Sequence, residues 1–351
     1  MSTASAATAA PAPSAAEQIA AARAGGEGAF LALAGPLRRE LQAHCYRMVG
    51  SLHDAEDLVQ ETLLRAWRSI DRFEGRASLR GWLYRIATNA CFDHLESRSR
   101  RQLLPERPPA DPRAPLEPAI EGMLWVEPYP DSALGEPPLG PEAQVSLRQS
   151  VQLAFLAALQ WLPPKQRAVL ILREVMGWPA AEVAEMLDLS VPAVNSALQR
   201  ARETLESRGI SRGEAPLRAD EAAEEKPEVL KLLGRYVRAW EDGDVGALVS
   251  LLREDAAFAM PPFLTWFRGR EAIRAFVAGA LLAGDARGRY RMVLTRANGA
   301  PAVATYELDP ASGAYRPRAV QVVEVAGDQV VAIHSFLDPS LPERFGLPAQ
   351  M

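Results

Sequence analysis

The sequence lacks the features that would assign it to several large classes of protein. Its 351 residues include only two cysteines, Cys45 and Cys91, which cannot build a disulfide framework and which fit a reducing compartment. Its apolar runs fall short of the roughly 20 residues that cross a bilayer. Residues 1–28 are rich in Ala, Ser and Pro without a basic leader or a concentrated apolar segment, so they predict a disordered tail rather than a signal peptide. We therefore expect a cytoplasmic protein without membrane contact.

A large excess of charge of either sign is also missing, but the distribution of charge is informative. The whole chain carries a formal charge of −5. Residues 35–104 carry a net +3, with 12 arginines and no lysine, residues 105–142 a net −6, residues 143–213 a net +2, and residues 214–351 a net −3. Two mildly basic modules are thus separated by an acidic, proline-rich connector and followed by an acidic module. The acidic average does not argue against DNA binding.

Residues 179–205, PAAEVAEMLDLSVPAVNSALQRARETL, predict two short helices around a tight turn. Ser190 is placed to cap the second helix. The inward stripe of that helix consists of Val194, Leu198, Ala201 and Leu205. Facing outward are side chains that can read base edges or contact phosphates: Pro192, Ala193, Asn195, Ser196, Gln199, Arg200 and Arg202. This pattern is typical of a helix-turn-helix that binds DNA; an ordinary helical hairpin with a solvated polar face is the alternative.

Neighbouring motifs favour DNA binding. LQWLPPKQRAVLILREVMGW, residues 159–178, resembles the start of region 4 of bacterial sigma factors. Residues 50–101 resemble region 2 of the extracytoplasmic-function (ECF) sigma factors through DAEDLVQETLLRAW, FEG and WLYRIATNACFDHLESRSRR, in the family's order. The resemblance implies that region 2 recognises the −10 promoter element, that region 4 recognises the −35 element, and that both bind core RNA polymerase, at the β′ clamp helices and the β flap. The family often has basic or aromatic residues where this chain has Asn195, Ala197 and Gln199, so no −35 sequence is carried over.

The helix DAEDLVQETLLRAW is the one that the family docks on the β′ clamp helices. Its acidic and glutamine side chains suit such a partner, whereas a simple solvated face is the alternative. The predicted contact residues are Asp54, Asp57, Leu58, Gln60, Glu61 and Leu64.

The loop FEGRAS corresponds to a family loop that receives a flipped base of the −10 element, which requires a preformed pocket. The predicted −10 contacts from this loop and the following helix are Phe73, Arg76, Ser78, Arg80, Arg85, Asn89 and Arg98. The cationic end of that helix suits phosphates, and it also complements the helix dipole. Trp82 is expected in the core rather than against DNA.

Cysteine and histidine cluster loosely in the same segment. Cys91 and His94 are three residues apart, and the other potential ligands nearby are His44, Cys45 and His53. A structural zinc site requires four ligands, and the adjacent His44 and Cys45 point to different faces of a helix. We therefore expect no metal site, and no cofactor.

Residues 105–142 contain closely spaced prolines and acids, which predict an extended linker. In ECF sigma factors the corresponding segment runs through the active-site cleft and RNA-exit path of the polymerase. Trp125 and Tyr129 are costly to expose to water, so LWVEPYPD is expected to dock on a partner. That partner is either the polymerase or the C-terminal part of this chain.

From about residue 226 the pattern becomes that of an α+β domain, in which helices precede an antiparallel sheet with Asn-Gly, Ser-Gly and Gly-Asp turns. The stretches GDV, MPP, GREAI, NGAPA and SFLDP resemble the SnoaL-like group of the nuclear-transport-factor-2-like cone fold, over nearly all of residues 226–340. The resemblance implies a pocket for a small molecule. Its possible lining residues are Trp240, Met260, Trp266, Phe276, Tyr306 and His334.

Enzymes of that group use an Asp or His for acid–base work. The available groups here are Asp255, Tyr306 and His334, and a satisfied core or surface histidine is the alternative for His334. Their spacing shows no paired His–Asp constellation, so no catalytic residue is assigned.

Together these patterns predict a multidomain protein with two all-α sigma domains and a C-terminal α+β cone. The predicted boundaries are a tail over 1–28, region 2 over 29–104, a linker over 105–142, region 4 over 143–213 and the SnoaL-like domain over 214–351. The predicted function is promoter recognition and transcription initiation, modulated in cis by a C-terminal module that docks on regions 2 and 4 or on the linker. The alternatives are a bifunctional protein whose cone also converts a small molecule, and a DNA-binding regulator that works without polymerase.

Overall fold

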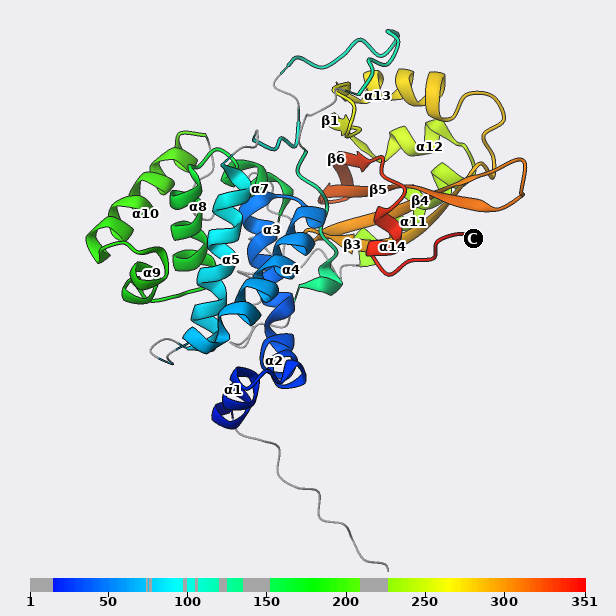
Figure 1. The fold of residues 1–351 in the computed structure, drawn as a ribbon. Helices are drawn as coiled ribbons and strands as arrows, with labels where there is room; N and C mark the ends of the chain where they lie inside the picture. The colour runs from blue at the N-terminus through cyan, green and yellow to red at the C-terminus, as the bar shows by residue number, and fades with distance from the viewer. Residues whose placement is uncertain are drawn as a thin grey trace, which may run out of the picture.

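The computed structural model describes residues 15–73, 75, 78–96, 100–104, 107–119, 125–134, 152–208 and 227–351. A helical half and an α+β half lie side by side (Figure 1). We call residues 15–104 the first helical module, residues 152–208 the second helical module, residues 105–142 the connector and residues 227–351 the C-terminal module. In the described part of the chain, no helix is both long enough and apolar enough to cross a membrane.

In the first helical module, three long helices pack against one another. Its elements are α1 (Ala15–Arg23), α2 (Glu27–Ala34), η1 (Gly35–Leu37), α3 (Arg38–Val49), α4 (Leu52–Ser69), η2 (Ile70–Arg72) and α5 (Leu79–Leu95). Serine hydroxyls cap two of them: Ser51 Oγ accepts from the amide of Asp54, and Ser78 Oγ accepts from the amide of Gly81. The helix α3 ends at Gly50, whose φ of 72° suits glycine.

The helix α1 corrects the prediction of a disordered tail over residues 1–28. Ala15–Arg23 is helical, Ala22 is buried, and the guanidinium of Arg23 donates to the backbone carbonyl of Phe73. Alanine has the highest helix propensity of any residue, so an Ala-rich stretch folds once a few of its side chains find a surface to pack on. Residues 1–14 lie outside the described residues.

The second helical module contains the predicted helix-turn-helix. Its elements are α7 (Leu153–Leu159), α8 (Pro164–Leu170), the π-helical turn η4 (Ile171–Val175), α9 (Ala180–Leu187) and α10 (Val191–Glu206). The predicted cap is confirmed, because Ser190 Oγ accepts from the amide of Ala193. The predicted inward stripe is confirmed as well, with Ala197 added to it: Val194, Ala197, Leu198, Ala201 and Leu205 are buried. Asp188 makes the turn between the two helices with a φ of 51°.

The C-terminal module is a curved six-stranded sheet with helices against one face. Its elements are α11 (Pro227–Glu241), α12 (Val245–Ser250), β1 (Leu252–Ala259), β2 (Trp266–Arg268), α13 (Arg270–Phe276), η6 (Val277–Leu281), β3 (Tyr290–Ala297), β4 (Ala300–Leu308), β5 (Tyr315–Ala326), β6 (Gln329–Phe336) and α14 (Leu341–Arg344). The strand order is β2-β1-β6-β5-β4-β3, in which β1 and β6 are parallel and the other neighbours antiparallel. The predicted Asn-Gly turn joins β3 to β4, with Asn298 at a φ of 57°.

The two faces of this sheet bury different cores. On the inner face, Val303, Val323 and Ile333 pack with the helices around Trp240. On the outer face, Val320, Val322 and Phe336 belong to the same hydrophobic cluster as the helical half. Successive side chains of a strand point to opposite faces, so one sheet supplies both cores.

The segment after β6 crosses the outer face. Leu341 in α14 and Phe345 directly after it are buried in the hydrophobic cluster that the outer face shares with the helical half. The tail then returns to the sheet, where the backbone of Met351 exchanges two hydrogen bonds with that of Tyr315, of 2.8 and 3.0 Å. Tyr306 also donates its hydroxyl to the carbonyl of Pro348 at 2.9 Å. The segment is thus held to the sheet at both of its ends.

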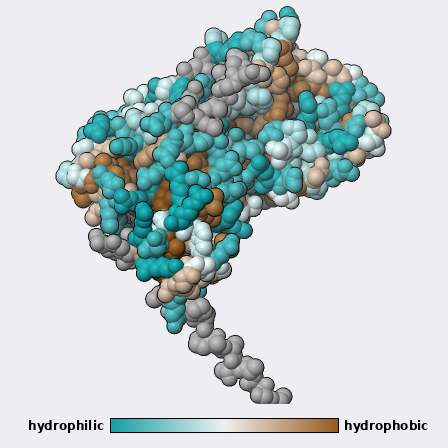
Figure 2. Space-filling model, in the orientation of Figure 1, coloured by the Kyte–Doolittle hydropathy of each residue, from teal (hydrophilic) through white to brown (hydrophobic). Residues whose placement is uncertain are grey.

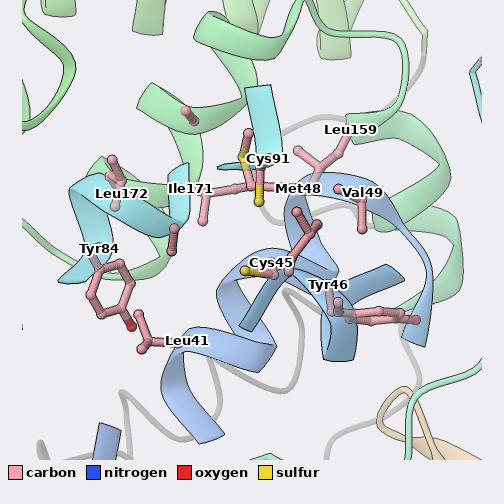
Figure 3. Packing of buried hydrophobic residues seen from close by; sticks show 14 of the residues in the cluster. Leu41, Cys45, Tyr46, Met48, Val49, Tyr84, Cys91, Leu159, Ile171 and Leu172 are labelled. Carbon is pink, nitrogen blue, oxygen red and sulfur yellow. The ribbon is translucent and has the colours of Figure 1, made fainter. Parts of the chain in front are cut away.

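The two helical modules share one core (Figure 3). Met48 and Val49 of α3 and Cys91 of α5 meet Leu159 of α7 and Ile171 of η4, all of them buried. Each fully buried aliphatic side chain stabilises by about 1.5–3 kcal/mol, so this shared core dominates the packing of one module on the other.

Candidate nucleic-acid interface

The recognition helix α10 presents a polar surface to solvent. Five of the residues predicted to contact DNA are exposed, namely Pro192, Asn195, Ser196, Gln199 and Arg200. Ala193 is half-buried. Gln199 donates to Glu203 at 2.9 Å, and Arg202 Nε donates to Glu174 at 2.7 Å. Arg202 therefore ties α10 to η4, whereas the exposed side chains remain available for base edges.

Of the residues predicted to line the base pocket in the FEGRAS loop, the structure describes Phe73 and Ser78. Phe73 is buried with its ring 5.1 Å from that of Trp82, so the prediction that it lines an open pocket is wrong for this arrangement. Burial of its large ring in the core outweighs display on a loop. Ser78 is exposed and caps α5. Arg76 and Arg98 lie outside the described residues.

Two arginines of α5 that were predicted to contact the −10 element pair with carboxylates of this chain. Arg80 Nε donates to Glu40 at 2.8 Å. Arg85 Nη2 donates to both carboxylate oxygens of Asp188, at 2.8 and 3.1 Å. Asp188 belongs to the turn of the helix-turn-helix, so the second helical module sits against the α5 surface that was expected to face DNA. Asn89, further along α5, is exposed.

An aromatic contact strengthens this packing, and sequence reasoning missed it. Trp178, just before α9, is buried 5.2 Å from the ring of Tyr84, with Arg80 above it at 5.1 Å. A side-chain carbon added at Gly81 would lie 3.4 Å from the indole, an ordinary contact distance, so the indole packs directly against this part of α5. The local signal of this contact in the sequence was Gly81, a glycine near the start of a predicted helix.

A buried arginine joins the same two modules. Arg167 of α8 donates to the carbonyl of Met48 at the end of α3, and at 2.9 Å to the side-chain oxygen of Gln160. Burial lowers the pKa of Arg167 to about 10. The group is charged at neutral pH and satisfies carbonyls at the end of a helix, where a cation is favourable.

The predicted polymerase-binding residues divide into two groups. Asp57 and Gln60 are exposed, and so is Leu64, at 49%. Glu61 is half-buried and accepts from Arg65 at 2.8 Å. Figure 2 shows that hydrophobic patches on this face of the helical half lie among hydrophilic residues.

Leu58 and Asp54 do not belong to that surface, which corrects the prediction for both. Leu58 is buried in the core. The carboxylate of Asp54 accepts from Arg101 and lies 3.1 Å from His94 Nε2. The spacing along α4 placed Asp54 on the polar side, but an arginine from beyond α5 reaches it there.

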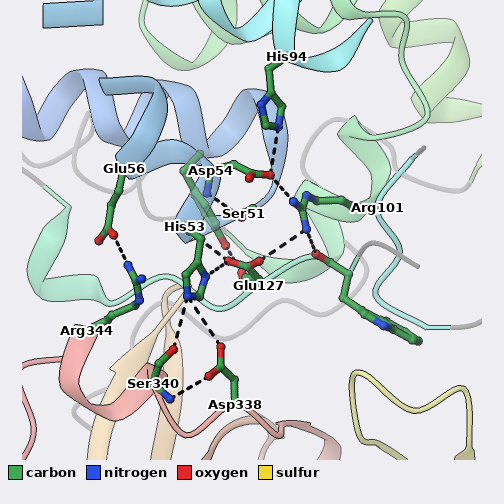
Figure 4. Close-up of polar contacts among 12 residues, drawn as sticks. Ser51, His53, Asp54, Glu56, His94, Arg101, Glu127, Asp338, Ser340 and Arg344 are labelled. Atoms are coloured by element: carbon green, nitrogen blue, oxygen red, sulfur yellow. Dashed lines mark hydrogen bonds and ion pairs between the residues drawn. The ribbon is translucent and has the colours of Figure 1, made fainter. Parts of the chain in front are cut away.

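The connector docks where the modules meet (Figure 4). Its described parts contain no α-helix and no strand, only η3 (Asp131–Ala133) and isolated bridges. Arg101, which is buried, donates to the carbonyl of Trp125 at 2.7 Å and lies 3.6 Å from the carboxylate of Glu127. The other oxygen of Glu127 accepts from His53 Nδ1 at 2.8 Å and from the amide of His53 at 3.2 Å.

The C-terminal module completes this junction. His53 Nε2 lies 3.5 Å from the hydroxyl of Ser340 and 3.9 Å from the carboxylate of Asp338. Arg344 of α14 pairs with Glu56 of α4. One imidazole thus links the first helical module, the connector and the C-terminal module. The hydrogen bond with Glu127 raises the pKa of His53.

Asn298, at the tip of the β3–β4 turn, makes a second three-way contact. Its side-chain oxygen accepts from the amide of Tyr129 at 2.8 Å, and its side-chain nitrogen donates to the hydroxyl of Tyr46 at 2.7 Å. The rings of Tyr46 and Tyr129 lie 4.4 Å apart. The prediction that the aromatic connector segment docks is confirmed, and its partners here are both the first helical module and the C-terminal module.

The possible pocket residues of the cone lie on opposite faces of the sheet. Trp240, Met260 and Phe276 are in the inner core. His334 follows the inward Ile333 and so faces outward, where its Nε2 lies 3.2 Å from Glu324.

Two further pocket candidates also belong elsewhere. Tyr306 lies on the outer face beneath the tail, and Trp266 donates its indole N–H to the carbonyl of Arg107 in the connector at 3.0 Å. The six residues therefore do not line one pocket, and Asp255 is an exposed surface residue paired with Arg253.

Sequence reasoning missed a polar group inside the cone. Tyr236 of α11 donates its hydroxyl to Gln321 of β5 at 2.5 Å, and both side chains are buried. On the same inner face, the hydroxyl of Thr305 has no hydrogen-bond partner among the residues that the structure describes. The available signal in the sequence was that Tyr236 and Gln321 each lie among apolar residues that were expected in the core.

The histidines of the helical half are accounted for by hydrogen bonds. His44 Nε2 lies 2.9 Å from the hydroxyl of Thr88, and burial lowers the pKa of His44 to about 3, so it is neutral. Cys45 and Cys91 are buried free thiols in the core.

Comparison with known proteins agrees with this architecture. The Sigma-70 region 2 family matches residues 33–101, the Sigma-70 region 4 family residues 152–205 and the SnoaL-like domain family residues 233–333. The chain is 46% identical over 324 residues to the ECF RNA polymerase sigma factor SigG of Mycobacterium tuberculosis, covering 92% of this chain and 84% of the relative.

A second relative shares the fold. ECF RNA polymerase sigma factor SigJ of Mycobacterium tuberculosis is 28% identical over 255 residues, covering 69% of this chain and 70% of SigJ. Its crystal structure superposes with a TM-score of 0.52 at 24% identity, covering 90% of this chain and 98% of that chain. The chain thus belongs to the ECF sigma factors of bacterial RNA polymerase, with its helical modules as regions 2 and 4 and a SnoaL-like domain as its C-terminal module.

Proposed function

We propose that this transcription initiation factor is held in a promoter-silent closed arrangement by its C-terminal module. By the closed arrangement we mean the packing of the two helical modules on each other together with the docked connector and C-terminal module. Once these modules separate, α5 contacts the −10 element and α10 the −35 element, while α4 binds the β′ clamp helices and the second helical module binds the β flap. Its working compartment is then the cytoplasm.

The pairing of Arg85 with Asp188 is the observation that carries this proposal. A carboxylate of the helix-turn-helix pairs with an α5 arginine that we expect to contact promoter DNA. The pair itself stabilises little, because both side chains are largely exposed and such pairs contribute about 0–1 kcal/mol. The shared core holds the modules together, and the ion pair shows which arginine of α5 the helix-turn-helix meets.

The position of the connector supports a role for the C-terminal module in maintaining closure. Trp125 and Tyr129 are buried between the first helical module and the C-terminal module, fixed by Arg101 and Asn298. The connector joins the two helical modules, so fixing it limits how far they can part. A signal can open the arrangement only by binding the open form more tightly than the closed one.

Run-off transcription with core polymerase tests the proposal, using promoters selected from a genomic fragment pool. We compare the full-length protein with an Arg344→Ala/Asn298→Gly variant, which loses contacts between the C-terminal module and the rest. Weakening closure by about 1.4 kcal/mol raises the open population about tenfold, so we expect run-off product to increase by up to that factor. The control is Arg316→Ala, which removes an exposed ion pair within the C-terminal module. Loss of product in the double variant would instead show that the C-terminal module assists initiation.

A second candidate function is binding of a small molecule within the cone. The buried Tyr236–Gln321 pair and the hydroxyl of Thr305, which has no partner among the described residues, favour an apolar ligand with one or two polar groups. Native mass spectrometry of the purified protein checks for such a ligand. A bound species that disappears in Tyr236→Phe and persists in Tyr315→Phe, a half-buried tyrosine whose hydroxyl donates to the carbonyl of Gly288, would support this function; an unliganded mass throughout would oppose it.

A further inference from the structure

The turn between β3 and β4 contains a chemically reactive pair of residues. The chain has three asparagines, and Asn298 is the one that a glycine follows. Asn298 and Gly299 both have a positive φ, of 57° and 72°, as in the tight two-residue turn of a β-hairpin. In an Asn-Gly pair the backbone nitrogen of the glycine can attack the side-chain amide of the asparagine, because no side chain on the glycine obstructs the approach. The pair that suits this turn is therefore also prone to deamidation.

Deamidation of this pair consumes water and releases ammonia. The backbone nitrogen of Gly299 bonds to Cγ of Asn298, and its proton leaves with the side-chain nitrogen as ammonia. Water then opens the resulting cyclic imide, either to aspartate or to isoaspartate, in which the main chain runs through the side-chain carboxyl carbon. The reaction requires no oxidant, cofactor or enzyme, so the surroundings of the pair decide how fast it proceeds.

The closed arrangement engages each group that takes part in this reaction. The N–H of Gly299 donates to the carboxylate of Asp131 at 2.9 Å. The side-chain oxygen of Asn298 accepts from the amide of Tyr129, and its side-chain nitrogen donates to the hydroxyl of Tyr46. Asn298 is 1% exposed, so water is kept from the amide. Closure thus holds the attacking nitrogen away from the reaction and protects the amide.

The partners that protect the pair all belong to other parts of the chain. Tyr46 lies in α3, and Tyr129 and Asp131 lie in the connector. Movement of the C-terminal module away from them removes all three contacts together. The turn itself persists, because the pairing of Ala297 with Ala300 lies within the β3–β4 hairpin. Opening therefore presents an intact Asn-Gly turn to water.

The product of the reaction does not fit the closed arrangement. Aspartate keeps an acceptor for the amide of Tyr129 but has a carboxylate oxygen in place of the nitrogen that donates to Tyr46. The hydroxyl of Tyr46 already donates to the carbonyl of Glu127 at 2.6 Å, so it has no second proton for that oxygen. The nearby carboxylate of Asp131 repels the new charge, and burial of an unpaired charge is unfavourable. Isoaspartate also lengthens the main chain of the turn, so both products oppose closure.

We propose that Asn298 is a deamidation site that closure protects, and that the deamidated protein stays open. Conversion then proceeds during the time that a molecule spends open, so the modified fraction reports the accumulated open time. This inference rests on the proposed function for the link between opening and initiation. The protection of the site involves neither polymerase nor DNA, so it is tested separately.

The rate of deamidation in the full-length protein provides the first experiment. Mass spectrometry of peptides measures the converted fraction at Asn298 after incubation at neutral pH, with digestion at mildly acidic pH to limit conversion during preparation. The variant Trp125→Ala/Arg344→Ala loses contacts of the connector and of α14 away from the turn. If only the open form reacts, an open population that is about tenfold larger gives a rate about tenfold higher. The control Arg316→Ala should react at the rate of the unmodified sequence.

A second asparagine separates opening from unfolding. Asn195 is exposed on α10 and is followed by Ser196, and the helical backbone there does not depend on the β3–β4 turn. Its rate should be equal in all samples. The variant His53→Gln/Arg344→Ala changes only partly exposed side chains and provides the same comparison if the first variant unfolds. Across the variants, the rate at Asn298 should be proportional to the open population measured by energy transfer between dyes on the two halves.

The effect of the product is measured with Asn298→Asp. Loss of a buried hydrogen bond and gain of a buried charge should raise the open population about five- to tenfold, and the run-off product should rise with it. The matched control is Gln350→Glu, which makes the same change from amide to acid at an exposed residue of the tail. It should leave both measurements unchanged.

Three results would overturn the inference. Equal rates at Asn298 in the unmodified sequence and in both opened variants would mean that closure gives no protection. Conversion in the urea-unfolded chain but in none of the folded samples would mean that opening does not release the site. An open population unchanged by Asn298→Asp would mean that the product fits the closed arrangement. Deamidation that follows opening while the run-off product stays constant would count against the proposed function instead.

Discussion

The two faces of the C-terminal sheet have the same strands and opposite roles. The inner face closes a core that belongs to the C-terminal module alone, around Trp240 and Phe258. The outer face contributes Val320 and Phe336 to a core shared with the helical half. A module built in this way can fold through one face and regulate through the other. Changes to the inner face should therefore act on folding, and changes to the outer side should act on closure.

The largest effect is expected on the inner face. Trp240→Ala removes a side chain that is 2% exposed, and a cavity of that size costs about 3–5 kcal/mol. Calorimetry should show a lower unfolding temperature for the C-terminal module. An unchanged thermogram would mean that the inner core repacks around the loss and that the contrast between the faces is weaker than the packing indicates.

A smaller effect is expected where the outer side meets the connector. Asn298→Gly preserves the backbone turn, because glycine tolerates the φ of 57°, but it leaves the buried amide of Tyr129 without an acceptor. We expect the closed arrangement to lose about 1–3 kcal/mol, with the unfolding temperature of the inner core unchanged. Hydrogen exchange at residues 125–134 should become faster. Equal exchange in both proteins would show that Asn298 does not hold the connector.

The smallest effect concerns pH at the three-way junction. The pKa of His53 is raised by its hydrogen bond to Glu127 despite partial burial, with Asp338 favouring and Arg344 opposing the charged form. Two further charged groups lie next to these partners: Arg101 is 3.6 Å from Glu127, and Glu56 pairs with Arg344. Since the pKa is raised on closure, the stabilisation is fully present below the ordinary value of 6.5 and is lost as pH rises through the raised value.

Because the side chain of His53 is one-third exposed, the gain from its protonation is at most about 1 kcal/mol. Energy transfer between dyes on the helical half and the C-terminal module should report a slightly more open protein at pH 8 than at pH 6. The variant His53→Gln should remove that difference. A pH response that survives in this variant would assign it to another group.

Local patterns in the sequence predicted much of this structure. The Ser190 cap, the buried stripe of α10 and the Asn-Gly turn depend on neighbours within a few residues, and all three are confirmed. The sigma-factor family and its fold were likewise predicted from motifs in order, and the comparisons confirm both.

What the sequence could not provide is the set of partners across long separations. Arg85 was placed correctly on a polar helix face, but the carboxylate opposite it lies 103 residues further on. His334 shows a related limit, because strand alternation assigns it to one of two faces without saying which face is inner. Phe73 was expected in a loop site and is packed in the core, since burial of an aromatic ring overrides its local setting.

The return of the tail to the sheet bears on how the protein would switch. The segment carrying Arg344 is fixed at one end by β6 and at the other by the paired backbones of Met351 and Tyr315. A helix anchored at both ends cannot swing away by itself, so its contact with α4 breaks only when the whole C-terminal module moves. Release would then be all-or-none, with a steep rather than graded response to its signal.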